Sequence, residues 1–292
     1  MEYKAELIVD SKATLGEGPS WDRNQKILYW VDILGKRIHI YDYVSKKNRF
    51  IEVNQYVGTA VPRKSGGLVL ALQNGFYSLN PQTDQLTLMA NTEEHLPQNR
   101  FNDGKCDAAG RFWAGTMGLD DAYGVGSLYC LDTENNVKTV LQNVTCSNGL
   151  AWSPDNRTMY YIDTPTSQIV AFDFNIEDGS ICNERVVVEI PREMGFPDGM
   201  TIDEEGMLWV AHWQGFRIGR WNPFTGKLIQ AIPIPAPLVT SCSFGGENMD
   251  ELFITTARIG LSEETLLQYP QSGGVFKIKT DVKGMGMYPF LG

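Results

Sequence analysis

Four side chains that end in a carboxylate or amide oxygen each stand directly before a glycine, at widely separated places in the chain. These pairs are Glu17-Gly18, Asp103-Gly104, Asn148-Gly149 and Asp198-Gly199. Carboxylate and amide oxygens are ligands that a hard divalent cation accepts, and such a site tolerates ligands from distant chain segments. Softer metals prefer His or Cys, and His39, His95 and His212 all lie away from these pairs. The pattern predicts a site for one divalent metal ion, with Ca²⁺ the best match and Zn²⁺, Mg²⁺ or Mn²⁺ as alternatives.

The position of these pairs favours a site over ordinary turns. A single Asp or Asn before glycine is also typical of a tight turn, in which the side chain bonds to nearby backbone groups. Each of the four pairs, however, lies about ten residues before a short apolar segment. In a repeating fold, side chains at one offset converge in space, so the oxygens of Glu17, Asp103, Asn148 and Asp198, with Asn102 and Arg100 beside them, are predicted to form one ring.

The apolar segments themselves form a repeat. They cover residues 27–32, 67–71, 111–116, 158–163, 207–211 and 251–256. Equivalent positions in successive segments lie 40 to 49 residues apart, which is the length of four short strands with their turns and is typical of a propeller blade. The sequence therefore predicts an all-β fold, a six-bladed β-propeller with four-stranded antiparallel blades. Residues 1–292 would form this single domain.

The two ends of the chain are predicted to share one blade. Residues 4–9 read as a strand without a blade of its own, and residues 274–279 read as a strand without a complete set of partners. Pairing of the N- and C-terminal strands would close the ring and remove an exposed sheet edge. Helical pattern is scarce, and Ser262 is expected to cap one short turn that Pro270 ends.

Composition narrows the classes of partner. The net charge is −10 and no Lys/Arg cluster is longer than two residues, which argues against nucleic acid or an anionic membrane as a partner. No apolar run has the length of a signal peptide core or a membrane span, so a cytoplasmic location is expected. The five cysteines lack CxxC spacing and are interpreted as reduced thiols.

The motifs together resemble those of the SMP-30/gluconolactonase/luciferin-regenerating-enzyme family, also called regucalcin-like proteins, and in particular its bacterial-type sugar lactone lactonases. The resemblance runs nearly end to end and rests on residues 15–21, 99–105, 110–117, 147–150, 196–200 and 240–246. It implies a six-bladed propeller with a divalent metal held by Glu17, Asn148 and Asp198. It also implies that Arg100 and Asn102 bind sugar hydroxyls, with help from Asp120 rather than Asp121, and that Asp103 lies nearby.

The function implied by this resemblance is metal-dependent hydrolysis of a sugar lactone, such as gluconolactone, to the aldonic acid. The metal would polarise the lactone carbonyl, and Asp198 is the candidate general base. Two alternatives stay open: an esterase or organophosphate hydrolase that uses the same site, and a non-catalytic calcium-binding or regulatory propeller. His212 is interpreted as a packed or surface residue. The oligomeric state, the physiological lactone and the native metal do not follow from the sequence.

Overall fold

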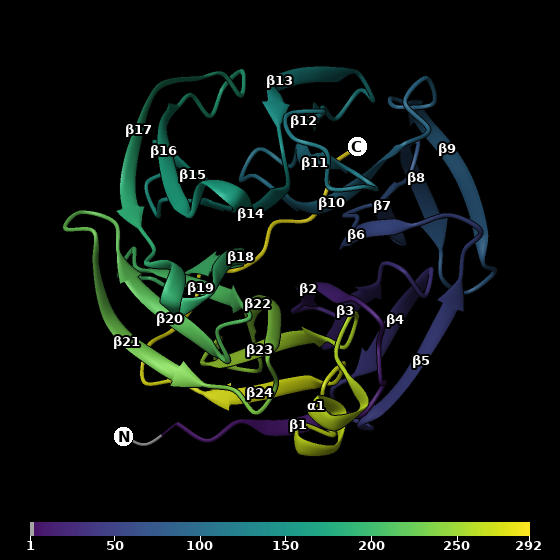
Figure 1. Ribbon diagram of the computed structural model, residues 1–292. Helices are drawn as coiled ribbons and strands as arrows, with labels where there is room; N and C mark the ends of the chain where they lie inside the picture. Colours follow the sequence, from purple (N-terminus) through teal and green to yellow (C-terminus); the bar gives the residue numbers. More distant parts are fainter. Residues whose placement is uncertain (1–2) are drawn as a thin grey trace.

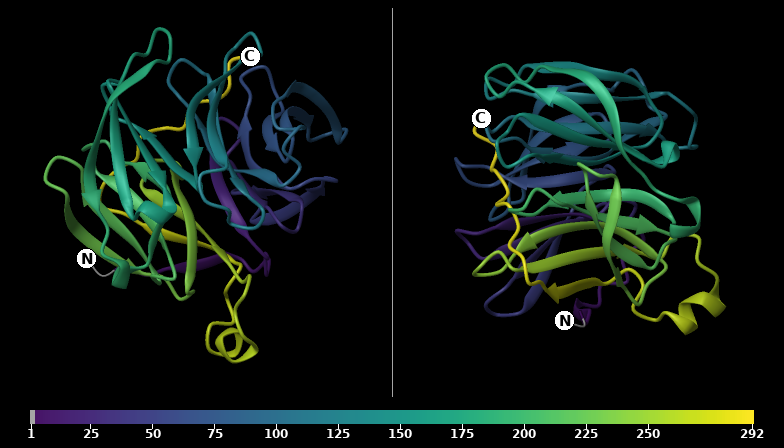
Figure 2. Two further views of the ribbon diagram at one scale, coloured as in Figure 1. Left: turned by 45° about the horizontal axis from the view of Figure 1, so that its top comes forward. Right: turned by 90° about the vertical axis from the view of Figure 1, so that its left-hand side faces the viewer.

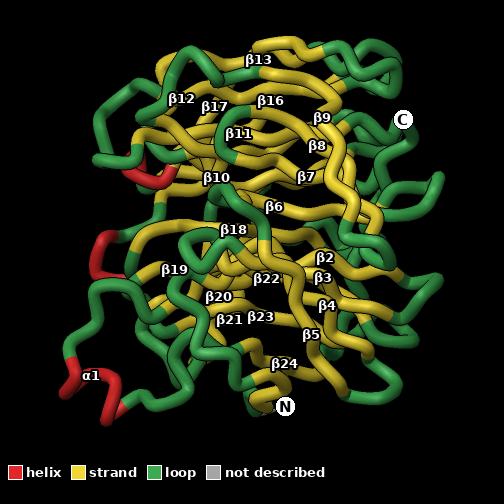
Figure 3. The backbone as a smooth tube through the Cα atoms, turned by 90° about the vertical axis from the view of Figure 1, so that its right-hand side faces the viewer, coloured by secondary structure: helices red, strands yellow, loops and turns green. Residues whose placement is uncertain are grey.

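The computed structural model describes residues 3–292, and its regular structure is almost entirely β-strand (Figures 1 and 3). Strands in the middle of each sheet, such as β3 (Ile27–Asp32) and β7 (Leu68–Leu72), are buried almost throughout. They are rich in the branched and aromatic side chains that suit a pleated, buried surface. The last strand of each set, such as β9 (Gln85–Asn91), is largely exposed. The apolar repeat therefore marks the buried middle of each sheet.

Four sheets are four-stranded and antiparallel, and each is built from four consecutive strands. The first contains β2 (Gly16–Asp22), β3, β4 (Arg37–Asp42) and β5 (Lys47–Glu52). The second contains β6 (Val57–Pro62), β7, β8 (Gly75–Asn80) and β9. The third contains β10 (Asn99–Cys106), β11 (Phe112–Gly118), β12 (Gly126–Leu131) and β13 (Val137–Val144). The fourth contains β14 (Ser147–Trp152), β15 (Thr158–Asp163), β16 (Gln168–Phe174) and β17 (Ile181–Glu189).

The remaining strands form one larger sheet that divides into two sets of four. One set is β18 (Phe196–Ile202), β19 (Leu208–Trp213), β20 (Arg217–Asn222) and β21 (Lys227–Pro233). The other is β22 (Leu238–Gly245), β23 (Glu251–Ala257), β24 (Val275–Lys279) and β1 (Glu6–Val9). A single pairing, Trp213 with Leu238, joins the two sets. The antiparallel pairing of β1 with β24 confirms that the two predicted terminal strands lie side by side.

The sheets are arranged around a common centre, with the first strand of each set nearest to it (Figure 1). These inner strands are β2, β6, β10, β14, β18 and β22. Each contacts the next in the series, and β22 contacts β2. Buried side chains fill the space between sheets, including the aromatic residues Tyr29, Trp30, Trp113, Tyr160, Tyr161 and Trp209 of the repeat. The inner strands therefore bring residues from distant parts of the sequence to one central region.

The two ends of this central region differ. The last residues, 283–292, form a C-terminal strap that runs across one end (Figures 1 and 2). The strap makes backbone hydrogen bonds to several sheets, among them Met285 N to Ile202 O, Phe290 N to Pro62 O and Leu291 N to Gly110 O. The short helical segments η1 (Thr164–Thr166), η2 (Arg192–Met194) and α1 (Glu263–Gln268) lie on the other side (Figure 3).

Two smaller predictions also agree with the structure. Ser262 caps α1, because its side chain accepts a hydrogen bond from the backbone N–H of Thr265, and the helix ends before Pro270. All five cysteines are free thiols, and Cys106, Cys130 and Cys242 are buried. Within residues 3–292, none of the helices has the length and apolar character needed to cross a bilayer.

Candidate active site

Each inner strand carries one extra residue relative to its partner. The predicted residues Glu17, Asn102, Asp103, Asn148 and Asp198 lie at these bulges, whereas Arg100 pairs regularly with Met117. In β14, Ser147 pairs with Asp163 and Leu150 with Tyr161, so a step of three residues along β14 matches a step of two along β15. The same three-against-two spacing occurs in β2, β10 and β18. In β6 and β22 the shift is shorter, two residues against one. A bulge bends the strand and redirects a side chain, and the longer bulges occur in the four sheets predicted to carry the polar–Gly pairs.

The bulges place the predicted residues around one cavity of about 470 Å³. Its polar lining includes Glu17, Arg100, Asn102, Asn148 and Asp198. They come from β2, β10, β14 and β18, and all five side chains are buried. A buried carboxylate is costly unless it is neutralised or hydrogen-bonded, so a cavity that gathers two of them beside an arginine is built for a charged or strongly polar ligand.

The amide of Asn148 is held in one orientation. Its Nδ2 donates to Thr164 Oγ1 at 2.9 Å, and Thr164 Oγ1 donates to Pro197 O at 2.8 Å. This chain of bonds fixes Asn148 to the residue that precedes Asp198. Its Oδ1 atom is buried and, among the described residues, has no hydrogen-bond partner. A buried acceptor left unpaired costs about 1–3 kcal/mol, so this oxygen is a position that a cation or a ligand donor would satisfy.

Glu17 and Asp198 are electrostatically coupled. Burial raises the pKa of Glu17 well above its usual value, and the negative charges of Asp198 and Asp103 raise it further. Burial also raises the pKa of Asp198 well above its usual value, with Asp103 adding to the effect. A divalent cation beside them would oppose these shifts and favour the ionised form of both carboxyls. The donor set of Glu17, Asn148 and Asp198 therefore fits a hard divalent cation.

Histidine and cysteine contribute no ligand set of their own. Within residues 3–292, no group of three or more His, Cys, Asp or Glu side chains is arranged to hold a metal ion. The predicted set contains two carboxylates and an amide, and an amide oxygen is a common ligand of hard cations. The fit to a cation therefore depends on Asn148 as much as on the two acids.

Arg100 and Asn102 form a connected pair on the cavity wall. Arg100 Nη1 donates to Asn102 Oδ1 at 2.7 Å and to Phe101 O at 3.1 Å. Asn102 Nδ2 donates to Ser147 O at 2.9 Å in the neighbouring sheet. Arg100 thus orients Asn102, and the remaining guanidinium donors of Arg100 are available to a bound ligand in the cavity.

The acidic loop places its two aspartates differently. Asp121 lines the cavity. Asp120 Oδ1 instead accepts a hydrogen bond from the backbone N–H of Ala122, which stabilises its own turn. The structure therefore offers Asp121 to a ligand more directly than Asp120, although which of them contacts substrate stays a prediction.

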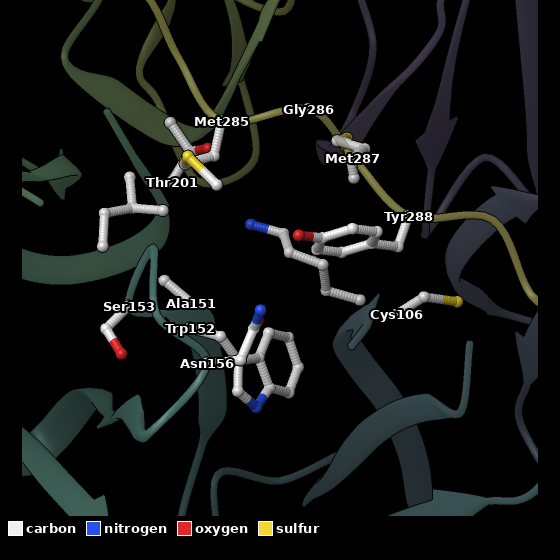
Figure 4. A pocket seen from close by; sticks show the side chains of 12 residues that line it. Cys106, Ala151, Trp152, Ser153, Asn156, Thr201, Met285, Gly286, Met287 and Tyr288 are labelled. Atoms are coloured by element: carbon white, nitrogen blue, oxygen red, sulfur yellow. The ribbon is translucent and has the colours of Figure 1, made fainter. Parts of the chain in front are cut away.

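Asp103 lies behind the cavity rather than on its wall. Its Oδ1 accepts a hydrogen bond from Gly104 N at 2.7 Å. Burial raises the pKa of Asp103, and the nearby Lys105 ammonium opposes that shift. Lys105 Nζ donates to Met200 O and faces a small hollow of about 30 Å³ at the strap end. Met285, Met287 and Tyr288 of the strap lie on one side of this hollow and Trp152 on the other (Figure 4).

His212 is a core residue, in agreement with its interpretation as a packed side chain. It is fully buried. Nδ1 bonds to Met194 O at 3.0 Å, and Trp221 Nε1 donates to Nε2 at 3.3 Å. Burial lowers the pKa of His212 to about 4. Both ring nitrogens are occupied by protein groups, so His212 is not placed to move a proton for a ligand.

Several cavity residues were not singled out from the sequence. They include Thr164, Cys146, Met117, Trp213, Leu238, Ile259 and Leu261. Thr164 follows Asp163 at the end of a predicted strand, where nothing in the residue type marks it. Ile259 and Leu261 lie in the loop before α1. These positions become part of the site only because strand ends and loops from different sheets meet at one end of the central region.

A family model, curated relatives and solved structures that resemble this chain all point to one protein family. Residues 15–258 match a family model described as the SMP-30/Gluconolactonase/LRE-like region. A candidate sugar lactone lactonase of Bacillus subtilis, YvrE, is 38% identical over 288 residues, covering 99% of both chains. Regucalcin of Bos taurus is 40% identical over 295 residues, again covering 99% of both. The solved structure of a calcium-binding protein, regucalcin from Agrobacterium tumefaciens, superposes with a TM-score of 0.95 at 26% identity, covering 99% of this chain and 98% of that one.

Proposed function

The chain belongs to the SMP-30/gluconolactonase/LRE-like family, and from this premise we propose that it hydrolyses sugar lactones of the gluconolactone type to the aldonic acids. The observation that carries the proposal is the shared cavity of Glu17, Arg100, Asn102, Asn148 and Asp198, with the unpaired Asn148 Oδ1 inside it. Lactone hydrolysis needs a polarised carbonyl, an activated water and donors for several hydroxyls. This set of side chains supplies a place for each.

One divalent cation, held by Glu17, Asn148 and Asp198, would supply the positive charge that polarises the lactone carbonyl; Ca²⁺ fits this oxygen set best. The remaining roles fall to the chain itself. Asp198 takes a proton from the attacking water and returns it to the ring oxygen as the bond between the carbonyl carbon and that ring oxygen breaks. Arg100 and Asn102, fixed to each other, bind hydroxyl groups of the sugar and hold the ring in place. Asp121 or Asp120 binds a further hydroxyl.

The frame that supports this chemistry is, in our interpretation, a single six-bladed β-propeller over residues 1–292. The six four-stranded sets would be the blades, and the pairing of β1 with β24 would close the ring. The contact of β22 with β2 supports this interpretation. We further propose a cytoplasmic location and a small-molecule sugar lactone as the partner. The net charge of −10 argues against nucleic acid or an anionic membrane as a partner.

The test is a lactone panel on protein stripped of metal and reconstituted separately with Ca²⁺, Zn²⁺, Mg²⁺ and Mn²⁺. D-glucono-1,5-lactone should be hydrolysed well above its spontaneous rate with at least one metal, and chelation should abolish the activity. Rates equal to spontaneous hydrolysis with every metal would favour the non-catalytic, calcium-binding alternative, which the name of the Agrobacterium neighbour supports. Phosphotriesters and simple esters in the same panel address the esterase or organophosphate hydrolase alternative.

Replacement of Asp198 separates catalysis from folding. Asp198→Ala removes both a cation ligand and the proposed base, so lactonase activity should fall at least a thousandfold and the apparent affinity for the cation should weaken. The exposed Asp178, whose carboxylate accepts a hydrogen bond from Ser180 N, gives the matched control Asp178→Ala, which should retain normal activity. Full turnover in Asp198→Ala would rule out its role.

A further inference from the structure

An apolar groove opens from the side of the site cavity. It has a volume of about 250 Å³, far above the roughly 10–15 Å³ that one water needs. Its lining residues are Met117, Asp121, Thr145, Cys146, Thr164, Pro165, Phe196 and Trp213. Five of these, Met117, Asp121, Cys146, Thr164 and Trp213, also line the site cavity. The two spaces are therefore continuous, and a ligand bound beside Asn148 can extend into the groove.

The walls of the groove offer a ligand almost no polar partner. Trp213, Phe196 and Pro165 present apolar surface, and Met117 Sδ contacts Cys146 Sγ at 3.6 Å. The two threonine hydroxyls are already bound within the protein. Thr164 Oγ1 donates to Pro197 O at 2.8 Å, and Thr145 Oγ1 accepts a hydrogen bond from Gly124 N at 3.2 Å. Asp121, which lines both spaces, is the one acidic side chain among the residues that line the groove.

The aromatic walls are held by backbone pairing, so the groove is preformed. Trp213 pairs with Phe196 on β18 and with Leu238 on β22, which fixes it between two strands. Gly195, just before Phe196, has a φ of 91°, and a side chain there would meet Trp213 O at 2.5 Å. A preformed apolar surface binds an apolar group without first having to be ordered.

The rim of the site cavity is apolar as well, since it includes Leu15, Leu238, Ile259 and Leu261. A fully hydroxylated sugar lactone would turn hydroxyl groups toward these walls and lose hydrogen bonds to water without replacement. The polar side chains Glu17, Arg100, Asn102, Asn148 and Asp198 line the cavity, and none of them lines the groove. The cavity therefore offers polar partners to a lactone ring, and the groove offers apolar surface to a substituent.

We infer that the preferred substrate is a lactone that carries an apolar arm, with its ring among Glu17, Asn148 and Asp198 and its arm in the groove between Trp213 and Phe196. This inference rests on the proposed lactone hydrolysis and specifies its substrate class. The ring opens as before: water adds to the carbonyl carbon, the ring C–O bond breaks, and the product is a hydroxy acid that keeps its arm.

The test is a series of δ-lactones with one ring and a growing alkyl arm: δ-valerolactone, δ-octalactone and δ-decalactone, compared with D-glucono-1,5-lactone on the metal-loaded protein. Each methylene buried in the groove is worth about a fourfold gain in kcat/KM, carried mainly by KM. We expect δ-decalactone to exceed δ-valerolactone by at least a hundredfold and to exceed gluconolactone as well.

Substitutions at two groove residues test whether the gain in kcat/KM with arm length depends on the groove. Phe196→Ala and Trp213→Ala should each reduce the ratio of kcat/KM for δ-decalactone over δ-valerolactone by about tenfold, whereas Phe196→Leu should keep most of it. Phe224→Ala removes an aromatic that is 76% exposed and lines neither space, so it should leave the ratio unchanged. Circular dichroism and thermal melting identify any variant that fails to fold, and the remaining groove variant then decides the outcome.

The possible results separate this inference from the function on which it rests. If gluconolactone is hydrolysed and arm length has no effect, or if both groove variants keep the full ratio, the apolar-arm inference is overturned and lactone hydrolysis stands. If no lactone in the series is hydrolysed with any of the four metals, the proposed function fails, and the inference fails with it.

Discussion

Asn148 shows how one residue depends on its neighbours for its chemistry. An asparagine amide can turn either end toward a ligand, but Thr164 accepts a hydrogen bond from Asn148 Nδ2 and in turn donates to Pro197 O. The oxygen is therefore the end presented beside Asp198. Groups that orient a metal ligand commonly affect affinity nearly as much as the ligand does, which makes Thr164 a positioning residue of the proposed cation site.

Thr164→Val keeps the shape of the side chain and removes its hydroxyl. We expect the cation affinity, measured by isothermal titration calorimetry, to fall by about 10- to 100-fold, while the protein stays folded. Thr166→Val is the matched control, because Thr166 is exposed and its hydroxyl bonds only within its own turn, where it donates to Asp163 O and accepts from Gln168 N. Equal affinities in the two variants would contradict the positioning role.

His212 makes stability depend on pH. In the folded protein its pKa is lowered to about 4 because burial disfavours the charged ring; in the unfolded chain it is about 6.5. Between these values only the unfolded chain binds the proton, so the free energy of unfolding decreases as pH falls from about 6.5 to 4. The loss from this one group is at most about 3 kcal/mol. Above about pH 6.5 His212 makes its full contribution to the free energy of unfolding.

Urea unfolding at several pH values checks this expectation. Gln can donate to Met194 O and accept from Trp221 without titrating, so His212→Gln should show a shallower decline in stability below pH 6.5 than the parent protein. The exposed His95 provides the control His95→Gln, which should decline as the parent does. Identical slopes for all three proteins would show that His212 does not titrate as described.

At the scale of strands and turns, a repeated aspartate ties together the turn between the first two strands of a set. Asp203 Oδ1 accepts hydrogen bonds from Glu205 N and Met207 N, and Asp203 Oδ2 accepts from Trp209 Nε1 and Arg220 Nε. Asp107 makes the corresponding bonds to Trp113 Nε1 and Arg111 Nε. Each carboxylate closes a turn and also satisfies the indole of a buried tryptophan, which holds the inner strand against the next one.

Removal of this carboxylate should be costly. Asp203→Ala leaves the Trp209 indole without an acceptor and leaves the nearly buried Arg220 paired only with the exposed Glu205. Breaking such a buried pair costs about 3–5 kcal/mol. Asp173 forms an ion pair with Arg185 at a similar distance, 2.8 Å, but both side chains are exposed. Asp173→Ala should therefore cost less than about 1 kcal/mol. Denaturant unfolding of the two variants measures the difference, and equal losses would contradict the proposed role of the buried turn.

At the scale of the whole molecule, the C-terminal strap joins sheets that are far apart in the sequence. Besides its backbone bonds, it buries Phe290 completely among Val61, Phe101 and Phe112. Trp21 N and Ser243 Oγ also bond to Met287 Sδ. The strap covers the end of the central region opposite the cavity, so it stabilises the arrangement of sheets without touching the proposed cation ligands.

Phe290→Ala tests the strap. Loss of a fully buried phenylalanine costs about 3–5 kcal/mol, so the unfolding free energy should drop by this amount, whereas the cation affinity of the folded variant should stay unchanged. Phe224→Ala, which removes an exposed ring, should leave stability within about 0.5 kcal/mol. A destabilisation as small as that of Phe224→Ala would mean that the strap is not a structural tie.

The local sequence pattern was sufficient to predict the strands and to mark the residues with oxygen-bearing side chains. The predicted strand 27–32 coincides with β3, and the pairing predicted for the terminal strands is observed, because alternation and turn residues are properties of neighbouring positions. The repeat alone marked Glu17, Asp103, Asn148 and Asp198, since side chains at one offset in repeated units converge. The choice of Glu17, Asn148 and Asp198 as cation ligands came from the family resemblance.

Only the tertiary structure decided what surrounds those residues. The bulges that aim them arise from the register between two strands, and sequence alone does not encode a register shift that a partner strand imposes. Thr164, Trp213, Phe196 and Asp121 belong to the site because strand ends and loops from separate sheets meet at one end. The sequence by itself therefore determined an all-β repeat with a convergent oxygen set, while the fold decided that this set adjoins an apolar groove.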